Sequence, residues 1–153
     1  MESCDIKIDK EGIWYYRGAH MFRKEILCVF FESLKIDECG KYFIEMGDER
    51  CPLDVEDTVF VVAAVYGKRS EKNSEDRIDI MLTDDSLEKL DLGTLYVGKD
   101  NVLYCAVKNR KFPARFSRNS YYQLAEFIEQ EEKENSFFIN LNKEKYLINN
   151  NLF

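Results

Sequence analysis

The chain has 153 residues, of which 45% are hydrophobic and 14% aromatic. This is enough apolar material for one domain, or for two half-sized lobes with a packed core, and it excludes wholesale disorder. Acidic residues outnumber basic ones by 29 to 22, and the formal net charge of −7 opposes non-specific binding to nucleic acid or to an anionic membrane.

The sequence carries few signs of export, metal binding or membrane insertion. The longest apolar run, Val59 to Tyr66, is much shorter than a membrane span, and the charged N-terminus lacks the apolar segment of a signal peptide. The five cysteines are odd in number and include no C-x-x-C pair, which argues against a disulfide framework and a zinc ribbon. We therefore expect a cytoplasmic protein with no metal and no cofactor. Cys28 and Cys105 lie in apolar runs and should pack as small hydrophobic side chains.

The first third of the chain is predicted to contain four strands and one helix. The turn Asp9-Lys10-Glu11-Gly12 separates the first two strands and has the composition of a hairpin turn. Apolar residues recur at helical spacing from Ile26 to Leu34 and give the helix one broad apolar face. The predicted strands cover residues 5–8, 13–16, 41–46 and 51–55, and the helix covers residues 23–35.

The rest of the chain is predicted to be richer in strands. Residues 58–66 are apolar and β-branched, which is typical of a central strand. Their predicted partner is residues 77–83, where Ile78, Ile80 and Leu82 alternate with other side chains. The further predicted strands cover residues 95–97, 102–107, 136–141 and 145–148, with a polar loop at residues 67–76.

A second helix is predicted to begin at Ser120, which could form a capping box with Gln123. Pro113 has no backbone N–H, so we expect the segment before this helix to be a loop or the edge of a sheet.

The two ends of the chain resemble each other in pattern. An offset of 95 residues aligns Arg23 with Arg118, Phe43 with Phe138, Ile44 with Ile139 and Leu53 with Ile148. This suggests a strand–helix–strand–strand motif that occurs twice, although chance agreement of two hydrophobic patterns is the alternative. We predict an α+β fold of two associated lobes with mostly antiparallel sheets. The N-terminal lobe covers residues 1–66 and the C-terminal lobe residues 77–153, with the polar loop between them.

Candidates for catalysis are sparse. His20 is the only imidazole, and no nucleophile motif or metal-ligand spacing accompanies it. Asp54 and Glu56 share one face of a predicted strand and could bind a hard cation, but a solvated strand end is the simpler interpretation. No glycine-rich phosphate loop is present, which excludes P-loop and Rossmann sites. We therefore assign no catalytic residue, and a small hydrolase that uses these acidic residues or His20 is an alternative.

The most informative polar stretch is residues 108–122, which we call the basic–aromatic segment. Arginine side chains suit phosphate or carboxylate groups, and the N-terminus of the predicted helix adds a favourable dipole. The alternative is a sheet edge protected by charge. The candidate ligand-binding residues are Arg110, Lys111, Arg115, Arg118, Tyr121 and Tyr122.

Several stretches resemble the bacterial domain-of-unknown-function family DUF1285. They are "GIWYYRGAHMFRKEILCVFFESL", "GKYFIEMGDERCPLDVEDTVFVV" and "RFSRNSYYQLAEF". The matching positions are Trp14, Gly18, Arg23, Tyr42 to Ile44, Pro52 to Phe60, and Arg118 to Tyr122. The resemblance implies a mixed α and β fold with repeated motifs in two halves, a role in ligand sensing or signalling, and no known catalytic residues.

We therefore predict an uncharacterised bacterial protein that acts as a non-catalytic ligand- or protein-binding module with a regulatory or signalling role. Its expected partner is a small anionic ligand or an acidic peptide, not nucleic acid or a membrane. A structural protein that oligomerises through an edge strand, for example as a homodimer, is a further alternative.

Overall fold

A computed structural model describes residues 4–68, 76–133 and 136–150, which fall into two units, Met1–Val59 and Phe60–Phe153. The division falls at Val59, whereas the sequence suggested residue 66, because the strand that follows Val59 pairs with strands of the second unit. Of the polar loop predicted at residues 67–76, residues 69–75 lie outside the described residues. No helix in the described part of the chain is long and apolar enough to cross a membrane.

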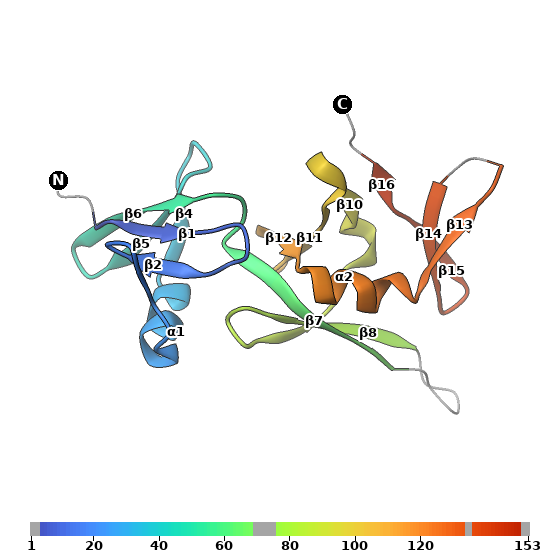
Figure 1. Cartoon of the computed structure of the whole chain (residues 1–153), viewed down its shortest axis with the longest axis horizontal. Helices are drawn as coiled ribbons and strands as arrows, with labels where there is room; N and C mark the ends of the chain where they lie inside the picture. The colour runs from blue at the N-terminus through green and yellow to red at the C-terminus, as the bar shows by residue number, and fades with distance from the viewer. Residues whose placement is uncertain (1–3, 69–75, 134–135, 151–153) are drawn as a thin grey trace. The chain divides into compact units, whose positions relative to one another are not determined.

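The N-terminal unit is one mixed sheet with a helix (Figure 1). Its described strands have the order β3-β2-β1-β6-β5-β4, and every pairing is antiparallel except that of β1 with β6. Ile6, Ile8, Trp14 and Ile44 are buried and form its core. The elements are β1 (Ile6–Ile8), β2 (Trp14–Tyr16), β3 (Ala19–His20), α1 (Lys24–Glu32), β4 (Leu34–Ile36), β5 (Tyr42–Met46) and β6 (Glu49–Val55).

The expectation that the chain lacks disulfides is wrong at one place. The parallel pairing sets Ile6 opposite Leu53, and this brings Cys4, just before β1, to a Cα–Cα distance of 5.5 Å from Cys51 on β6, where the two form a disulfide. Cys105 is buried as expected, but Cys28 is exposed on α1. An odd cysteine count therefore concealed one bonded pair.

The C-terminal unit contains a larger sheet and a smaller one. The larger sheet has the order β16-β10-β11-β12-β7-β8-β9, and β13-β14-β15 forms the smaller. As predicted, the apolar strand β7 is central and pairs with β8. The elements are β7 (Phe60–Lys68), β8 (Arg77–Leu82), β9 (Leu87–Lys89), a 3-10 turn (Leu92–Thr94), β10 (Tyr96–Val97), a second 3-10 turn (Lys99–Asn101), β11 (Leu103–Val107), β12 (Phe112–Phe116), α2 (Arg118–Ala125), β13 (Ile128–Glu131), β14 (Ser136–Leu141), β15 (Glu144–Leu147) and β16 (Asn149–Asn150).

The segment with Pro113 is neither a loop nor a sheet edge. It is β12, which pairs with β11 on one side and runs parallel to β7 on the other. The pairing with β7 begins at Ala114, directly after the proline, so the missing N–H lies before that ladder. The expectation from Pro113 of a loop or a sheet edge is therefore wrong.

Helix α2 begins earlier than predicted. Its N-cap is Ser117, whose side chain accepts a hydrogen bond of 3.1 Å from the backbone N–H of Ser120. Gln123 does not complete a capping box; its side-chain oxygen accepts a 2.8 Å hydrogen bond from the backbone N–H of Val65, next to a bulge in β7. Val65 pairs with Ile80 of β8, but the ladder of β7 with β12 ends at Val62, and the bond to Gln123 gives the Val65 N–H an acceptor beyond that point.

Each unit contains a lobe of similar topology, which runs from β1 to β6 in the first unit and from β10 to β16 in the second. In each lobe the first strand pairs with the second strand in antiparallel fashion and with the last strand in parallel fashion. In the first lobe, Ile8 lies opposite both Trp14 and Val55, and in the second, Val97 lies opposite both Leu103 and Asn150. Trp14 and Leu103 therefore occupy corresponding positions in the two lobes. The hairpins and helices that follow them in each lobe also correspond.

The hairpins β5–β6 and β14–β15 have the same register at an offset of 95 residues. Ile44 pairs with Cys51, and Ile139 pairs with Tyr146. Both Ile44 and Ile139 are almost fully buried.

The helices correspond at an offset of 94 residues, one fewer. Their N-caps are Arg23 and Ser117, and the strand residues that follow them, Leu34 and Ile128, pair with Ile44 and Ile139. The alignment of Arg23 with Arg118 is therefore wrong by one position. At the corrected offset, Phe31 of α1 corresponds to Ala125 of α2.

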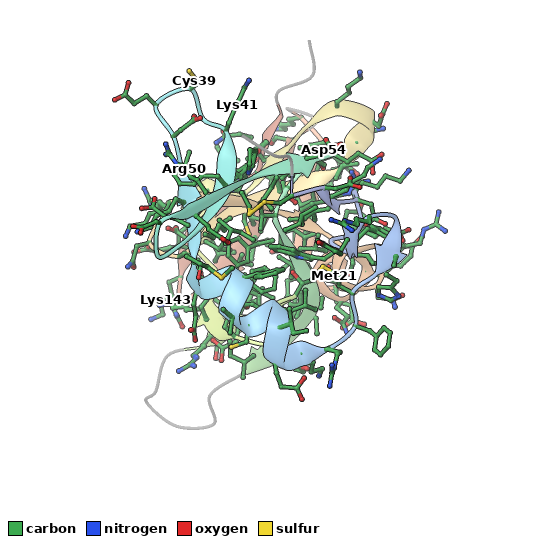
Figure 2. The ribbon with its side chains drawn as sticks, turned by 90° about the vertical axis from the view of Figure 1, so that its left-hand side faces the viewer. Met21, Cys39, Lys41, Arg50, Asp54 and Lys143 are labelled. Carbon is green, nitrogen blue, oxygen red and sulfur yellow. A yellow bond between two sulfur atoms is a disulfide. The ribbon has the colours of Figure 1, made fainter. Side chains whose placement is uncertain are left out.

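The turn between β14 and β15 offers a test of the register. Asn142 and Lys143 have φ angles of 53° and 69°, the left-handed conformation of a type I′ turn, in which glycine is favoured at the second position. Lys143→Gly should raise the free energy of unfolding by roughly 0.5–1 kcal/mol, because relief of the left-handed strain exceeds the entropy that glycine adds to the unfolded chain. Urea unfolding measures this; Lys41→Gly, where φ is not positive, should instead lower stability (both are labelled in Figure 2).

The disulfide offers a second test. Under oxidising conditions Cys4→Ser should lower the free energy of unfolding by roughly 2–4 kcal/mol, because the bond closes a long loop in the unfolded chain. Cys39→Ser, which removes an exposed free thiol, is the matched control and should change little. Equal stability of both variants in urea would show that the Cys4–Cys51 bond does not form in solution.

Candidate functional site

The basic–aromatic segment covers the β11–β12 turn, β12 and the first part of α2. Two of its bases are engaged with acidic residues of the same unit. Lys108 Nζ lies 2.8 Å from Asp84 Oδ2, and Arg110 Nε lies 2.7 Å from Asp91 Oδ2. These two charges are thus partly neutralised by ion pairs within the protein.

Those contacts hold an unusual turn. Lys108, Asn109 and Arg110 have consecutive positive φ angles of 55°, 59° and 64°. Each non-glycine residue in the left-handed region costs about 1 kcal/mol. The backbone N–H of Lys108 also donates to Glu88 at 3.2 Å, so the acidic residues fix the strained turn. Lys108 and Arg110 therefore have a structural role, which the sequence pattern could not separate from ligand binding.

The structure does not gather the six candidate residues into one place. Arg110 and Lys111 lie in the turn before β12, whereas Arg118 follows the strand at its other end. A strand of this length separates its ends by roughly 17 Å. Arg115 lies half-buried on β12 between them.

At the α2 end, Tyr121 and Tyr122 are exposed, and their ring centroids lie 5.7 Å apart. Tyr121 is the candidate residue that also lines a cavity, described below.

The residues of the hydrolase alternative do not converge. Strand pairing places His20, Tyr15, Lys7 and Asp54 in one row across four strands, on the exposed face of the N-terminal sheet. Three strand spacings separate His20 from Asp54 by roughly 14 Å, too far for a shared proton. Glu56 is also exposed, and its side chain accepts a hydrogen bond from the backbone N–H of Lys10 at 2.8 Å (Asp54 is labelled in Figure 2). Among the residues that the structure describes, no group of three His, Cys, Asp or Glu could hold a metal ion.

The C-terminal unit has an open cavity beside α2, which we call the α2 cavity. It has a volume of about 690 Å³, within the range of small-molecule sites. In Figure 1, α2 lies between β12 and the small sheet of β13, β14 and β15. The apolar lining comes from β10, β11, α2, β13, β14 and the segment before β16: Val97, Leu103, Ala125, Ile128, Phe137 and Ile148.

The polar side chains that line the α2 cavity, among the residues that the structure describes, are uncharged. They are Asn101, Tyr121, Gln130 and Ser136. Ser136 Oγ is buried and has no hydrogen-bond partner among the described residues. A buried hydroxyl without a partner is uncommon and costly, so it needs an explanation such as a bound molecule.

Sequence reasoning found Tyr121 but missed the cavity. Its lining residues come from six separate elements, and as single positions they read as ordinary core or strand residues. The one available signal was the alignment of the two lobes, in which Leu103 stands where the first lobe has Trp14.

The fold is shared with two solved structures. One is a DUF1285 family protein from Silicibacter pomeroyi DSS-3, with a TM-score of 0.75 and 18% sequence identity over 95% of this chain and 80% of that chain. The other is a DUF1285 family protein from Shewanella baltica OS155, with a TM-score of 0.62 and 19% identity over 80% of this chain and 91% of that chain. No family model and no curated protein matches the chain. The fold implied by the sequence resemblance is thereby confirmed; at these identities the similarity does not extend to function.

The ion pair of the β11–β12 turn predicts a pH dependence. Burial raises the pKa of Asp84, but hydrogen bonds from Lys108 and Ser86 outweigh it and hold the pKa below its ordinary value of 3.8. A carboxylate with a lowered pKa stabilises the fold above its unfolded-state pKa, and this contribution is lost as the pH falls through the folded-state pKa. Wild type should therefore lose more stability than Asp84→Asn between about pH 6 and pH 3.

Urea unfolding at several pH values measures this difference. Asp48→Asn, in the turn between β5 and β6, controls for the removal of one negative charge. If the curves of wild type and Asp84→Asn run parallel, the ion pair contributes nothing to the acid dependence.

Proposed function

We propose that this protein is a non-catalytic binding module whose small-molecule ligand occupies the α2 cavity. The observation that carries the proposal is the cavity itself, whose described lining combines apolar side chains with a few uncharged polar groups and one buried hydroxyl that has no partner among the described residues. This composition is typical of small-molecule binding sites.

The chemistry of the lining favours binding over catalysis. In the part of the chain that the structure describes, no His, Cys, Asp, Glu, Lys or Arg lines the α2 cavity, and Tyr121 is the one titratable side chain of the lining. Hydrolysis needs a nucleophile paired with a base. A binding protein without such a pair would act by changing its interactions when the ligand binds, which is the regulatory or signalling role that we propose.

We also propose that the two lobes arose by duplication of one unit. The supporting observation is that the hairpin registers and the parallel pairings correspond position by position. Duplication leaves one copy to maintain the fold while the other acquires a binding site.

A second candidate is an anionic ligand or acidic peptide at the N-terminal end of α2. Arg118 is the first residue of the helix and is exposed, and Arg115 lies on the strand before the Ser117 cap. Arginine side chains and a helix N-terminus both favour negative charge.

A thermal-shift screen of metabolites and metal ions against three proteins separates the candidates. The proteins are wild type, Ala125→Phe, which fills the α2 cavity, and the double variant Arg115→Ala plus Arg118→Ala. Ligands of the cavity should raise the melting temperature of wild type and of the double variant, and should lose most of this effect in Ala125→Phe, because bound ligand stabilises only the protein that can hold it.

Ala63→Phe, an exposed alanine on β7 outside the cavity lining, controls for the added ring. Ligands that still stabilise Ala125→Phe but no longer stabilise the double variant would show that the binding site is at Arg115 and Arg118. Hits that are insensitive to every variant would contradict both candidate sites.

A further inference from the structure

The α2 cavity lies where the N-terminal lobe has two large aromatic side chains. Strand pairing makes Leu103 the counterpart of Trp14, and the helix offset makes Ala125 the counterpart of Phe31. Both Leu103 and Ala125 line the cavity. The comparison thus accounts for the cavity: Leu103 and Ala125 are smaller than Trp14 and Phe31, which stand at the same positions in the first lobe.

In the N-terminal lobe the same place is filled. The Trp14 ring packs edge-on against Phe31 with a centroid distance of 5.1 Å, and it lies 5.9 Å from Phe30. Trp14 is only 2% exposed. This lobe therefore shows that the framework can hold two packed aromatic rings at the positions of Leu103 and Ala125, so the fold does not require a cavity there.

The polar groups of the α2 cavity indicate what it can hold. Among the described residues the lining contains no charged side chain, so a charged group placed inside would lose part of its hydration without gaining an ion-pair partner there. Ser136 Oγ is buried without a partner among the described residues, and a hydroxyl can donate one hydrogen bond and accept others. Ser136 Oγ is not open to solvent, so its side chain would turn toward the cavity to meet a ligand oxygen, while the apolar lining would cover part of the molecule.

We propose that the α2 cavity binds an uncharged, largely apolar small molecule with a hydroxyl or carbonyl oxygen that hydrogen-bonds to Ser136. This inference rests on the proposed function, since it specifies the ligand class of the same cavity. It differs from the sequence-based expectation of an anionic ligand, which placed the ligand on arginine side chains outside the lining. The second lobe would thus use a bound apolar molecule where the first uses its own Trp14 and Phe31.

Matched probes that differ in charge test the ligand class. Octanol and propylphenol are the uncharged probes, and octanoate and propylbenzoate are their anionic counterparts. Calorimetric titration of wild type should give saturable binding of the uncharged probes and affinity for the anionic probes weaker by about tenfold or more. Binding of octanol should shift the methyl NMR signals of Leu103 and Ile128.

Variants locate the probe within the cavity. Ala125→Phe should weaken octanol binding by about tenfold or more without loss of folded structure, because Phe31 shows that the lobe framework accepts this ring. Ala63→Phe should bind as wild type does. Ser136→Ala should weaken octanol binding roughly fivefold, the effect of one lost hydrogen bond, while the free protein should be at least as stable as wild type, because the substitution removes a buried hydroxyl without a partner among the described residues.

The outcomes separate this inference from the proposed function. If the anionic probes bind as tightly as octanol, or if neither uncharged probe binds wild type, the ligand class is wrong. The binding function then still stands provided that screen hits of another class are lost in Ala125→Phe. If octanol binds wild type and Ala125→Phe equally, the location is wrong as well. Destabilisation of the free protein by Ser136→Ala would overturn the role of Ser136.

Discussion

The parallel pairing of the first and last strands is the constraint on which each lobe depends. β1 pairs with β6 and β10 with β16, and parallel neighbours need a long crossover between them. The crossover in each lobe contains the helix and several strands, and it brings the last strand of the lobe beside the first one. As a result, Phe31 of α1 packs on Trp14, the first residue of β2. In the other lobe, α2 lines the α2 cavity together with Leu103, which is the counterpart of Trp14. The Cys4–Cys51 disulfide is another consequence of the same pairing.

Within this shared framework, side-chain size at two positions decides whether the space between helix and sheet is filled by aromatic rings, as by Trp14 and Phe31, or left open, as beside Leu103 and Ala125. Protein interiors are close-packed, so a lost ring leaves either a collapsed core or a cavity. The C-terminal unit keeps a cavity because the segments around it are held by other contacts. The hydrogen bond from the Val65 backbone to Gln123 fixes α2 on β7, and the β13–β14–β15 sheet holds Ser136 and Phe137 at the other wall. The charged residues of the unit act elsewhere, where Lys108 and Arg110 stabilise a left-handed turn.

Much of the fold could be predicted from local pattern. The central strand β7, its partner β8 and both C-terminal hairpin strands are read from alternation and β-branched residues, because side-chain direction alternates along any strand. Pro113 and Cys4 misled the prediction because the outcome depended on a partner far away in the chain, β7 for Pro113 and Cys51 for Cys4. The start of α2 was misplaced locally, because the cap is Ser117, three residues before Ser120. Of the six candidate residues, Tyr121 is the one that lines the α2 cavity, and the basic candidates lie along β12 and at both of its ends.

The sequence alone determined the positions of most strands and helices, the acidic surface, and the correspondence of the two hairpins at an offset of 95 residues. These follow from periodicity and composition, which are properties of neighbouring residues. The tertiary structure alone decided which strands pair in parallel, which cysteines bond, which bases are held in ion pairs, and that Leu103 and Ala125 face the same space. A cavity is the difference between the volume that a framework encloses and the volume that its side chains fill, and residues far apart in the chain set both quantities.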